Sequence, residues 1–185
     1  MNSLIRNILP LMPRSLVYCD VGARWGIGDP WKSFEALLGL LRFEPDGEEY
    51  ASLMKKRGQN HLIFQYALYR EAKDIPLNVT KSRGCSSLYE PNFECLNHYA
   101  DVKRFEIERV VDIPASSLDL LFGAGVFAKI DFIKIDVQGA ELDILKGGQE
   151  VLSKQALGME IEVEFQPLYK GQPLFSDIDV YIRDT

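Results

Sequence analysis

Short apolar runs alternate along the chain with polar segments that have the spacing of amphipathic helices. Apolar runs of this length, bounded by turn residues, are typical of buried strands. The pattern predicts strands at 16–21, 40–44, 62–68, 130–137 and 159–165. It predicts helices at 31–38, 47–57, 139–146 and 175–183. Strands that alternate with helices predict an α/β fold with a mainly parallel, doubly wound sheet.

The interval from residue 70 to residue 117 breaks this regularity, because Pro76, Gly84, Pro91 and Pro114 interrupt it. We expect a short hairpin and an insertion there. The whole length of 185 residues fits one domain, with residues 1–14 as a flanking segment. The chain carries 21 Lys and Arg against 27 Asp and Glu, a net charge of −6. An acidic domain does not attract phosphate backbones, so nucleic acid is not an expected partner.

The last predicted strand alternates strictly between apolar and acidic residues. Glu160, Glu162 and Glu164 share one face, and Met159, Ile161, Val163 and Phe165 share the other. A strand buried on both faces would be apolar throughout. The acidic face therefore indicates solvent, a sheet edge or a functional cleft, and the pattern leaves these three open.

The N-terminus and the cysteines indicate a cytoplasmic protein. Arg6 and Asn7 interrupt the first apolar run, and no stretch is long enough to span a membrane. Three cysteines without paired spacing predict free thiols. His61 and His98 have no partner at a zinc-binding spacing, so no metal site is predicted.

A glycine-containing turn follows the first strand. It runs from Asp20 to Gly28, and its spacing from Gly22 is Gly-x-x-x-Gly-x-Gly, with Gly26 as the second glycine. A dinucleotide site has Gly-x-Gly-x-x-Gly, which makes an NAD-dependent oxidoreductase a weak alternative. The acid before the turn disfavours an anion and suits a ligand with an ammonium group. S-adenosylmethionine (SAM) carries both an ammonium and a sulfonium.

A second acid closes the second strand. Glu44 stands where a carboxylate accepts both hydroxyls of a ribose, and Pro45 and Asp46 then turn the chain. Arg24, in the glycine turn, is either a partner for a ligand carboxylate or an exposed loop residue.

Several motifs together resemble the FkbM family of SAM-dependent methyltransferases. They are Asp20-Val21-Gly22-Ala23, Phe43-Glu44-Pro45-Asp46, the serine-containing segment 85–92, Ile130 to Glu141, and Glu162 to Tyr169 followed by Phe175-Ser176-Asp177. The resemblance covers residues 16–183, and its most specific part is 130–147. It implies a Rossmann-like methyltransferase fold, SAM as methyl donor, and a hydroxyl oxygen of a sugar, polyketide or similar small molecule as acceptor.

The resemblance also implies roles for individual residues. Asp20, Gly22 and Ala23 would line the methionine part of the cofactor, and Glu44 would hold its ribose. Ser86 and Ser87 fall in a serine-rich segment near the cofactor. Asp136 and Glu141 would face the reaction centre. Either acid could be the base that takes the proton of a hydroxyl acceptor, or Asp136 could bind the ammonium of the cofactor. Glu141 could equally be an acid favoured at a helix start.

Two features depart from the family pattern. Residues 24–31 replace a shorter asparagine-containing turn, which favours, as the alternative function, a SAM- or nucleotide-binding module without catalysis. A full methyltransferase sheet has seven strands, whereas only five core strands are predicted here. We therefore expect strand 159–165 at or near an edge, without the C-terminal antiparallel hairpin. That hairpin was removed, lost in evolution, or replaced by pairing with another copy of the chain in a homo-oligomer.

Overall fold

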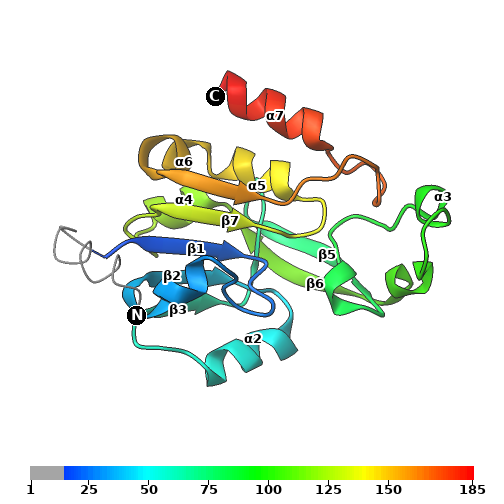
Figure 1. Ribbon diagram of the computed structural model, residues 1–185. Helices are drawn as coiled ribbons and strands as arrows, with labels where there is room; N and C mark the ends of the chain where they lie inside the picture. The colour runs from blue at the N-terminus through cyan, green and yellow to red at the C-terminus, as the bar shows by residue number, and fades with distance from the viewer. Residues whose placement is uncertain (1–14) are drawn as a thin grey trace.

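A five-stranded parallel sheet forms the centre of the molecule. The structure is a computed structural model that describes residues 15–185, so the predicted flanking segment 1–14 lies outside the described residues. The strand order is β3-β2-β1-β7-β8 (Figure 1). The strands are β1 (Val17–Val21), β2 (Gly39–Phe43), β3 (His61–Phe64), β7 (Phe132–Ile135) and β8 (Gly158–Ile161). The strand order reverses at β1, which pairs with both β2 and β7.

Helices cover both faces of this sheet. On one face, Cys19 and Val21 of β1 belong to a core that includes side chains of four helices. On the other face, Tyr18 packs near a 3-10 helix and Ala23 packs against α2. The covering helices are α4 (Leu118–Gly123), α5 (Glu141–Gly147), α6 (Gln149–Gln155) and α7 (Phe175–Asp184), and on the other face η2 (Trp31–Leu37) and α2 (Gly47–Lys55). The predicted Rossmann-like, doubly wound α/β fold is confirmed.

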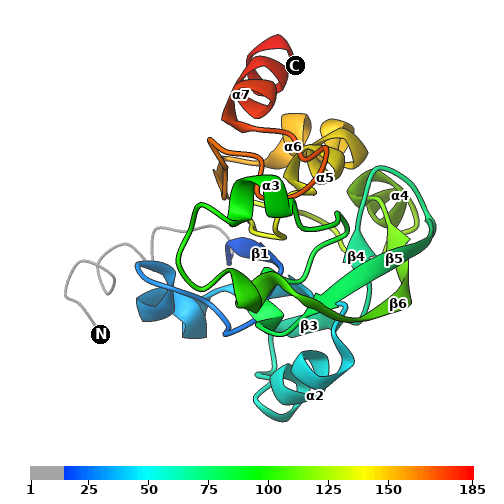
Figure 2. The same cartoon turned by 90° about the vertical axis from the view of Figure 1, so that its right-hand side faces the viewer.

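A second sheet fills the irregular interval. Its order is β4 (Ala67–Leu68), β6 (Ile107–Ser116) and β5 (Lys73–Thr80), and β5 and β6 are antiparallel. The chain between β5 and β6 carries η3 (Arg83–Cys85), α3 (Phe93–Leu96) and η4 (Val102–Phe105). In Figures 1 and 2 the α3 region lies beyond the ends at which β1 and β7 stop. The insertion is therefore placed over the carboxyl edge of the main sheet.

Several predicted elements differ in the structure. The apolar run 62–68 is two strands in different sheets, because β3 ends with β2 at Phe64 and Ala67 then pairs with β6. The segment 31–38 forms a 3-10 helix, and the helix predicted at 139–146 is followed by a separate α6 after the bend at Gly147 and Gly148. The helix α4 was not predicted. The expected short hairpin is a long antiparallel pair with the insertion between its strands.

The strand β8 forms an edge of the main sheet, as predicted. It is shorter than expected, because β7 stops at Ile135 and its carbonyl accepts the last ladder hydrogen bond from the amide of Glu162 (2.9 Å). Ile161 and Val163 pack onto the core. Within residues 15–185 no antiparallel strand follows β8 in this sheet.

No helix among residues 15–185 is long and apolar enough to cross a bilayer. Cys19, Cys85 and Cys95 are free thiols, as predicted, and the first two are buried. They add no covalent cross-link to the described part of the chain.

Candidate active site

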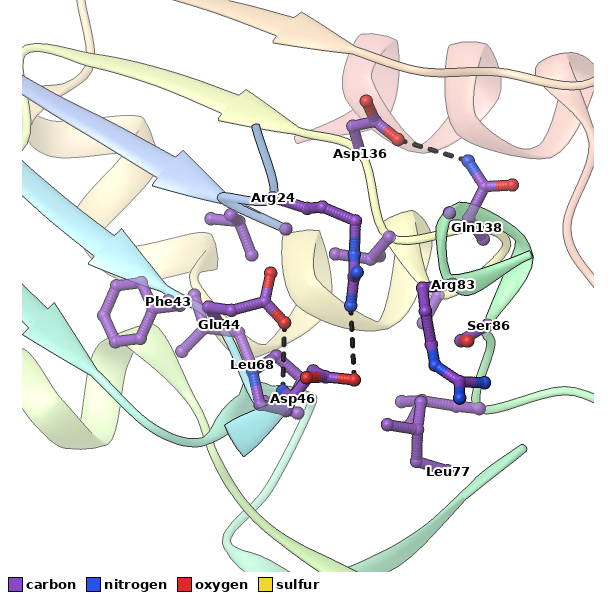
Figure 3. A pocket seen from close by; sticks show the side chains of 18 of the residues that line it. Arg24, Phe43, Glu44, Asp46, Leu68, Leu77, Arg83, Ser86, Asp136 and Gln138 are labelled. Carbon is purple, nitrogen blue, oxygen red and sulfur yellow. Dashed lines mark hydrogen bonds and ion pairs between the residues drawn. The ribbon is translucent and has the colours of Figure 1, made fainter. Parts of the chain in front are cut away.

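A cavity opens at the carboxyl ends of β1, β2 and β7, where the strand order reverses. Its volume is about 790 Å³ including the open mouth. Figure 3 shows the side chains around it, which come from the ends of β2 and β7, the glycine turn, β4, β5 and the η3 region. Ligands of doubly wound sheets bind at this position, because the connections leave in opposite directions there.

Gly22 forms the floor of the cavity at the end of β1. Its φ is +75°, and an added Cβ would lie 1.9 Å from the carbonyl oxygen of Asp136. The amide of Gly22 donates to the carbonyl of Phe43 (3.1 Å). Only glycine tolerates both this backbone conformation and this close approach.

Glu44 presents a buried carboxyl group at the end of β2. The residue is 4% exposed and lines the cavity. Its Oε1 accepts a hydrogen bond from the amide of Asp46 (2.9 Å), shown dashed in Figure 3. Burial raises the pKa of Glu44 to about 7, against the opposing effect of that amide. A carboxylate held in this way lacks donors, and ligand hydroxyl groups could supply them.

Beside Glu44 the cavity wall is apolar. Tyr66, Leu68, Leu77 and Leu88 line it together with Phe43. The rings of Phe43 and Tyr66 have their centroids 5.7 Å apart. An apolar wall next to one buried carboxyl group suits a ligand that has both a flat apolar part and hydroxyl groups.

Arg24 extends from the glycine turn into the cavity toward Asp46 (Figure 3). Its Nη2 lies 3.3 Å from Oδ2 of Asp46, and its Nη1 lies 4.0 Å from Glu49. Asp46 also caps α2 by accepting from the amides of Glu48 and Glu49. Burial would raise the pKa of Asp46, but the Glu49 amide and the Arg24 guanidinium outweigh it and hold the pKa below its usual value. Arg24 is therefore a paired residue of the wall.

Asp136 and Gln138 form the opposite wall, just beyond β7 (Figure 3). Nε2 of Gln138 donates to Oδ1 of Asp136 (3.2 Å), and Nζ of Lys134 lies 2.9 Å from Oδ2. Gln138 has a left-handed φ of 63°. That conformation costs a non-glycine residue about 1–2 kcal/mol, and such strain is concentrated at functional sites.

The two predicted serines play different parts. Ser86 lines the cavity, and its hydroxyl accepts from the amide of Thr80 (3.2 Å). Ser87 is 1% exposed; its hydroxyl donates to the carbonyl of Gln138 (2.6 Å) and accepts from the amide of Tyr89 (3.0 Å). Ser87 thus fixes the strained Gln138 backbone to the insertion.

Replacing Ser87 with alanine is expected to lower the free energy of unfolding by about 1–3 kcal/mol, because the half-buried Gln138 carbonyl and Tyr89 amide both lose their hydrogen bond to Ser87. Urea unfolding measures the change. Ser153→Ala is the matched control, since its hydroxyl is exposed and should be worth less than about 0.5 kcal/mol. Equal effects of the two substitutions would contradict the anchoring role of Ser87.

Glu141 is buried behind the turn that follows Asp136. Its Oε1 accepts from the amide of Val137 (3.0 Å) and its Oε2 from that of Gly139 (2.9 Å). Burial raises the pKa of Glu141, although these two amides oppose the shift. Both oxygens are engaged in holding the turn, and Glu141 does not line the cavity.

Asp20 lines a second cavity, on the other side of the glycine turn. This cavity, about 620 Å³, is also lined by Gly26, while Arg24 and Trp25 line both cavities. Asp20 is 1% exposed, and its Oδ2 has no hydrogen-bond partner. Arg42 Nε lies 3.8 Å from Oδ2, and Lys134 Nζ lies 4.0 Å from Oδ1. Burial raises the pKa of Asp20 to about 6, and those two cations oppose the shift.

The structure therefore gathers six of the predicted site residues around the first cavity. They are Gly22, Arg24, Glu44, Asp46, Ser86 and Asp136. Asp20 and Gly26 line the second cavity, Ala23 is buried against α2, and Ser87 and Glu141 support the wall from behind. Sequence reasoning assigned no role to Tyr66, Arg83 or Gln138, which also line the first cavity. Gln138 lies inside the most specific family motif, 130–147, so its position in that motif could have identified it as a candidate site residue.

Comparison with known proteins bears on the chemistry of this site. The profile of the Methyltransferase FkbM domain matches residues 20–185. The 2-O-methyltransferase NoeI of Sinorhizobium fredii (strain NBRC 101917 / NGR234) is 27% identical over 151 residues, 76% of this chain and 60% of NoeI. The chain thus spans about three-fifths of the length of that relative. The solved methyltransferase FkbM from Methylobacillus flagellatus KT aligns at 15% identity with a TM-score of 0.45, covering 76% of this chain and 30% of that one.

The profile match extends from the last residues of β1 to the end of the chain. It includes the glycine turn, Glu44, the serine segment and the Asp136 turn. The family resemblance seen in the sequence is therefore confirmed, and this chain belongs to the FkbM family of methyltransferases.

Proposed function

We propose that this protein binds SAM in the first cavity and transfers its methyl group to a hydroxyl oxygen of a small molecule, such as a sugar or polyketide. The observation that carries the proposal is the buried carboxyl group of Glu44, facing the cavity beside an apolar wall. Family membership supports a methyl-transfer reaction. The name of the relative, a 2-O-methyltransferase, supports oxygen as the accepting atom.

The residues present fit an adenosyl group. Glu44 would accept the two ribose hydroxyls, and the apolar wall at Tyr66 and Leu77 would hold the adenine ring. Gly22 allows the ligand to approach the backbone where β1 and β7 separate. Arg24 lines the cavity and is paired with Asp46, so one side of the cavity is polar.

When bound, SAM supplies a methyl group already activated by its sulfonium. The protein then has to align the acceptor oxygen with that methyl carbon, and alignment is worth about 7–11 kcal/mol of barrier. It also has to remove the hydroxyl proton, for which Asp136 is placed on the cavity wall. Glu141 contributes by holding the 137–139 turn that positions Asp136 and Gln138.

A thermal-shift titration tests the binding step. At 100 times its Kd, S-adenosylhomocysteine or SAM should raise the melting temperature by about 5 to 10 °C, because a ligand that binds only the folded state stabilises it. NADH is the comparison ligand and should give no shift. Stabilisation by NADH and not by SAM would overturn the proposal.

The altered glycine turn favours one alternative, a SAM-binding module without catalysis. In that case the Arg24–Asp46 ion pair would remain across the cavity and no acceptor would reach Asp136. Incubation with methyl-labelled SAM and a panel of methyl glycosides, oligosaccharides and macrolide alcohols separates the two functions. SAM binding without label transfer to any member of the panel would favour the alternative.

A further inference from the structure

Glu162, the residue that follows β8, contacts the wall of the first cavity through Gln138. In the register of β7 and β8, Ile135 lies opposite Ile161, so the positions that follow, Asp136 and Glu162, are neighbours on the same face. Nε2 of Gln138 hydrogen-bonds both carboxyl groups, Asp136 Oδ1 at 3.2 Å and Glu162 Oε2. The side chain of the strained Gln138 therefore holds the two carboxyl groups close together.

Because one amide nitrogen donates to both, the two carboxyl groups lie close together on the cavity side of the β7–β8 edge. Two carboxylates held this close repel each other, so the binding of one proton to the pair is favoured. Lys134, 2.9 Å from Asp136, favours negative charge on Asp136. The proton consequently belongs to Glu162, and the pair carries one negative charge.

The proton affinity of the pair follows from these contacts. Burial would raise the pKa of Asp136, but Lys134 and the hydrogen bond from Glu162 outweigh it and hold the pKa below its usual value. Burial and the hydrogen bond to Asp136 raise the pKa of Glu162 to about 8. A pair with one proton is thus a weak base, whereas the fully ionised pair binds a proton well near neutral pH.

We propose that Asp136 and Glu162 act as one proton acceptor for the hydroxyl group of the methyl acceptor, with Asp136 on the cavity wall and Glu162 as its positioning partner. The role rests on the proposed function. The acceptor oxygen forms a bond to the methyl carbon while the carbon–sulfur bond breaks and its electron pair stays on sulfur. The hydroxyl proton passes to the ionised pair. Charge is balanced, because the positive sulfonium and the negative carboxylate are both neutralised.

Other ionisable groups surround Glu162, and burial raises the pKa of each of them except Asp136. Burial raises the pKa values of Tyr169 and Cys85 above their already alkaline ordinary values, so both stay neutral. Glu141 accepts two backbone amide hydrogen bonds, which oppose the rise in its pKa, and Glu164 makes no contact with Gln138. The titratable groups that act on Glu162 are Asp136 just beyond β7, Glu141 on α5, Glu164 beyond β8, Tyr169 in the following segment and Cys85 on η3, while Lys134 on β7 is paired with Asp136.

The pH dependence of methyl transfer tests this role. At saturating SAM and with the glycoside that accepts label, kcat/KM should rise with pH and level off above about 8. The Glu162→Gln substitution keeps the shape of the side chain but leaves Asp136 as the single acid of the pair, with a low proton affinity. Its rate should be about 100-fold lower at the plateau and flat from pH 6 to 9, a loss at the lower end of what a general base contributes. Glu164→Gln, an equal change of charge two residues along, should keep the alkaline rise.

Carbon-13 NMR of the free protein with labelled glutamate carboxyls provides a readout that needs no acceptor. One signal should titrate near pH 8 and disappear in Glu162→Gln but not in Glu164→Gln. If wild-type protein binds no SAM or methylates nothing, the proposed function fails and the base role falls with it. If it methylates and Glu162→Gln retains the pH profile, or no glutamate signal that titrates near pH 8 is lost in Glu162→Gln, only the role of the pair is wrong.

Discussion

Gly22→Ala is expected to lower the free energy of unfolding by about 3 kcal/mol or more and to prevent SAM binding. The left-handed backbone costs alanine about 1–2 kcal/mol. The methyl group would also overlap the carbonyl oxygen of Asp136, 1.9 Å away, and overpacking of this kind costs a further ~1–3 kcal/mol. That oxygen belongs to backbone, so relief requires β1 and β7 to separate. Urea unfolding and calorimetry with S-adenosylhomocysteine measure the two effects.

Gly125→Ala is the matched control for this experiment. Gly125 has a similar φ of +72°, but an added Cβ would meet nothing within 4 Å. The Gly125→Ala protein should lose only about 1–2 kcal/mol of unfolding free energy, from the left-handed backbone alone. It should bind S-adenosylhomocysteine like the wild type. A Gly22→Ala protein as stable as Gly125→Ala would show that β1 and β7 do not approach as closely as the structure has them.

The strands that carry the site could be predicted from the sequence because each is a single apolar run with local turn residues. β1, β2 and β7 end within a few residues of the expected positions, which placed Gly22, Glu44 and Asp136 at one edge of the sheet. The parallel register then brings them together without further information. This is the part of the fold that depends on local pattern and general topology.

The rest depended on partners distant in the sequence. Phe64 and Ala67 lie in one apolar run, yet the strand of Phe64 pairs with β2 and the strand of Ala67 pairs with β6. No sequence feature near Ala67 indicates that its partner strand lies more than 40 residues away. The face of the sheet on which the Asp20 side chain lies could be predicted, because Cys19 and Val21 face the main core and successive side chains of a strand point to opposite faces. The contact between Gln138 and Glu162 could not be predicted, because it depends on the left-handed backbone of Gln138.

Glu44→Gln is expected to weaken S-adenosylhomocysteine binding by about 10- to 100-fold. Hydrogen bonds to a charged group contribute about 1.5–3 kcal/mol, and an amide can accept from only one of the two hydroxyls at Glu44. Binding to the wild type should also tighten as pH rises through about 7, where Glu44 ionises. Calorimetry from pH 5.5 to 8.5 measures both. Glu48→Gln, an exposed residue on α2, is the control and should bind like the wild type.

The same substitution should make the free protein more stable above neutral pH. The folded pKa of Glu44, about 7, lies above its ordinary value of 4.5. Its contribution to stability is therefore fully present below pH 4.5 and is lost as pH rises through 7, by about 3 kcal/mol. Glutamine keeps the hydrogen bond from the Asp46 amide and does not ionise. The stability gain of Glu44→Gln should thus be small at pH 5 and grow to pH 8, and a gain independent of pH, or weaker binding without any gain, would contradict a carboxylate kept buried for its ligand.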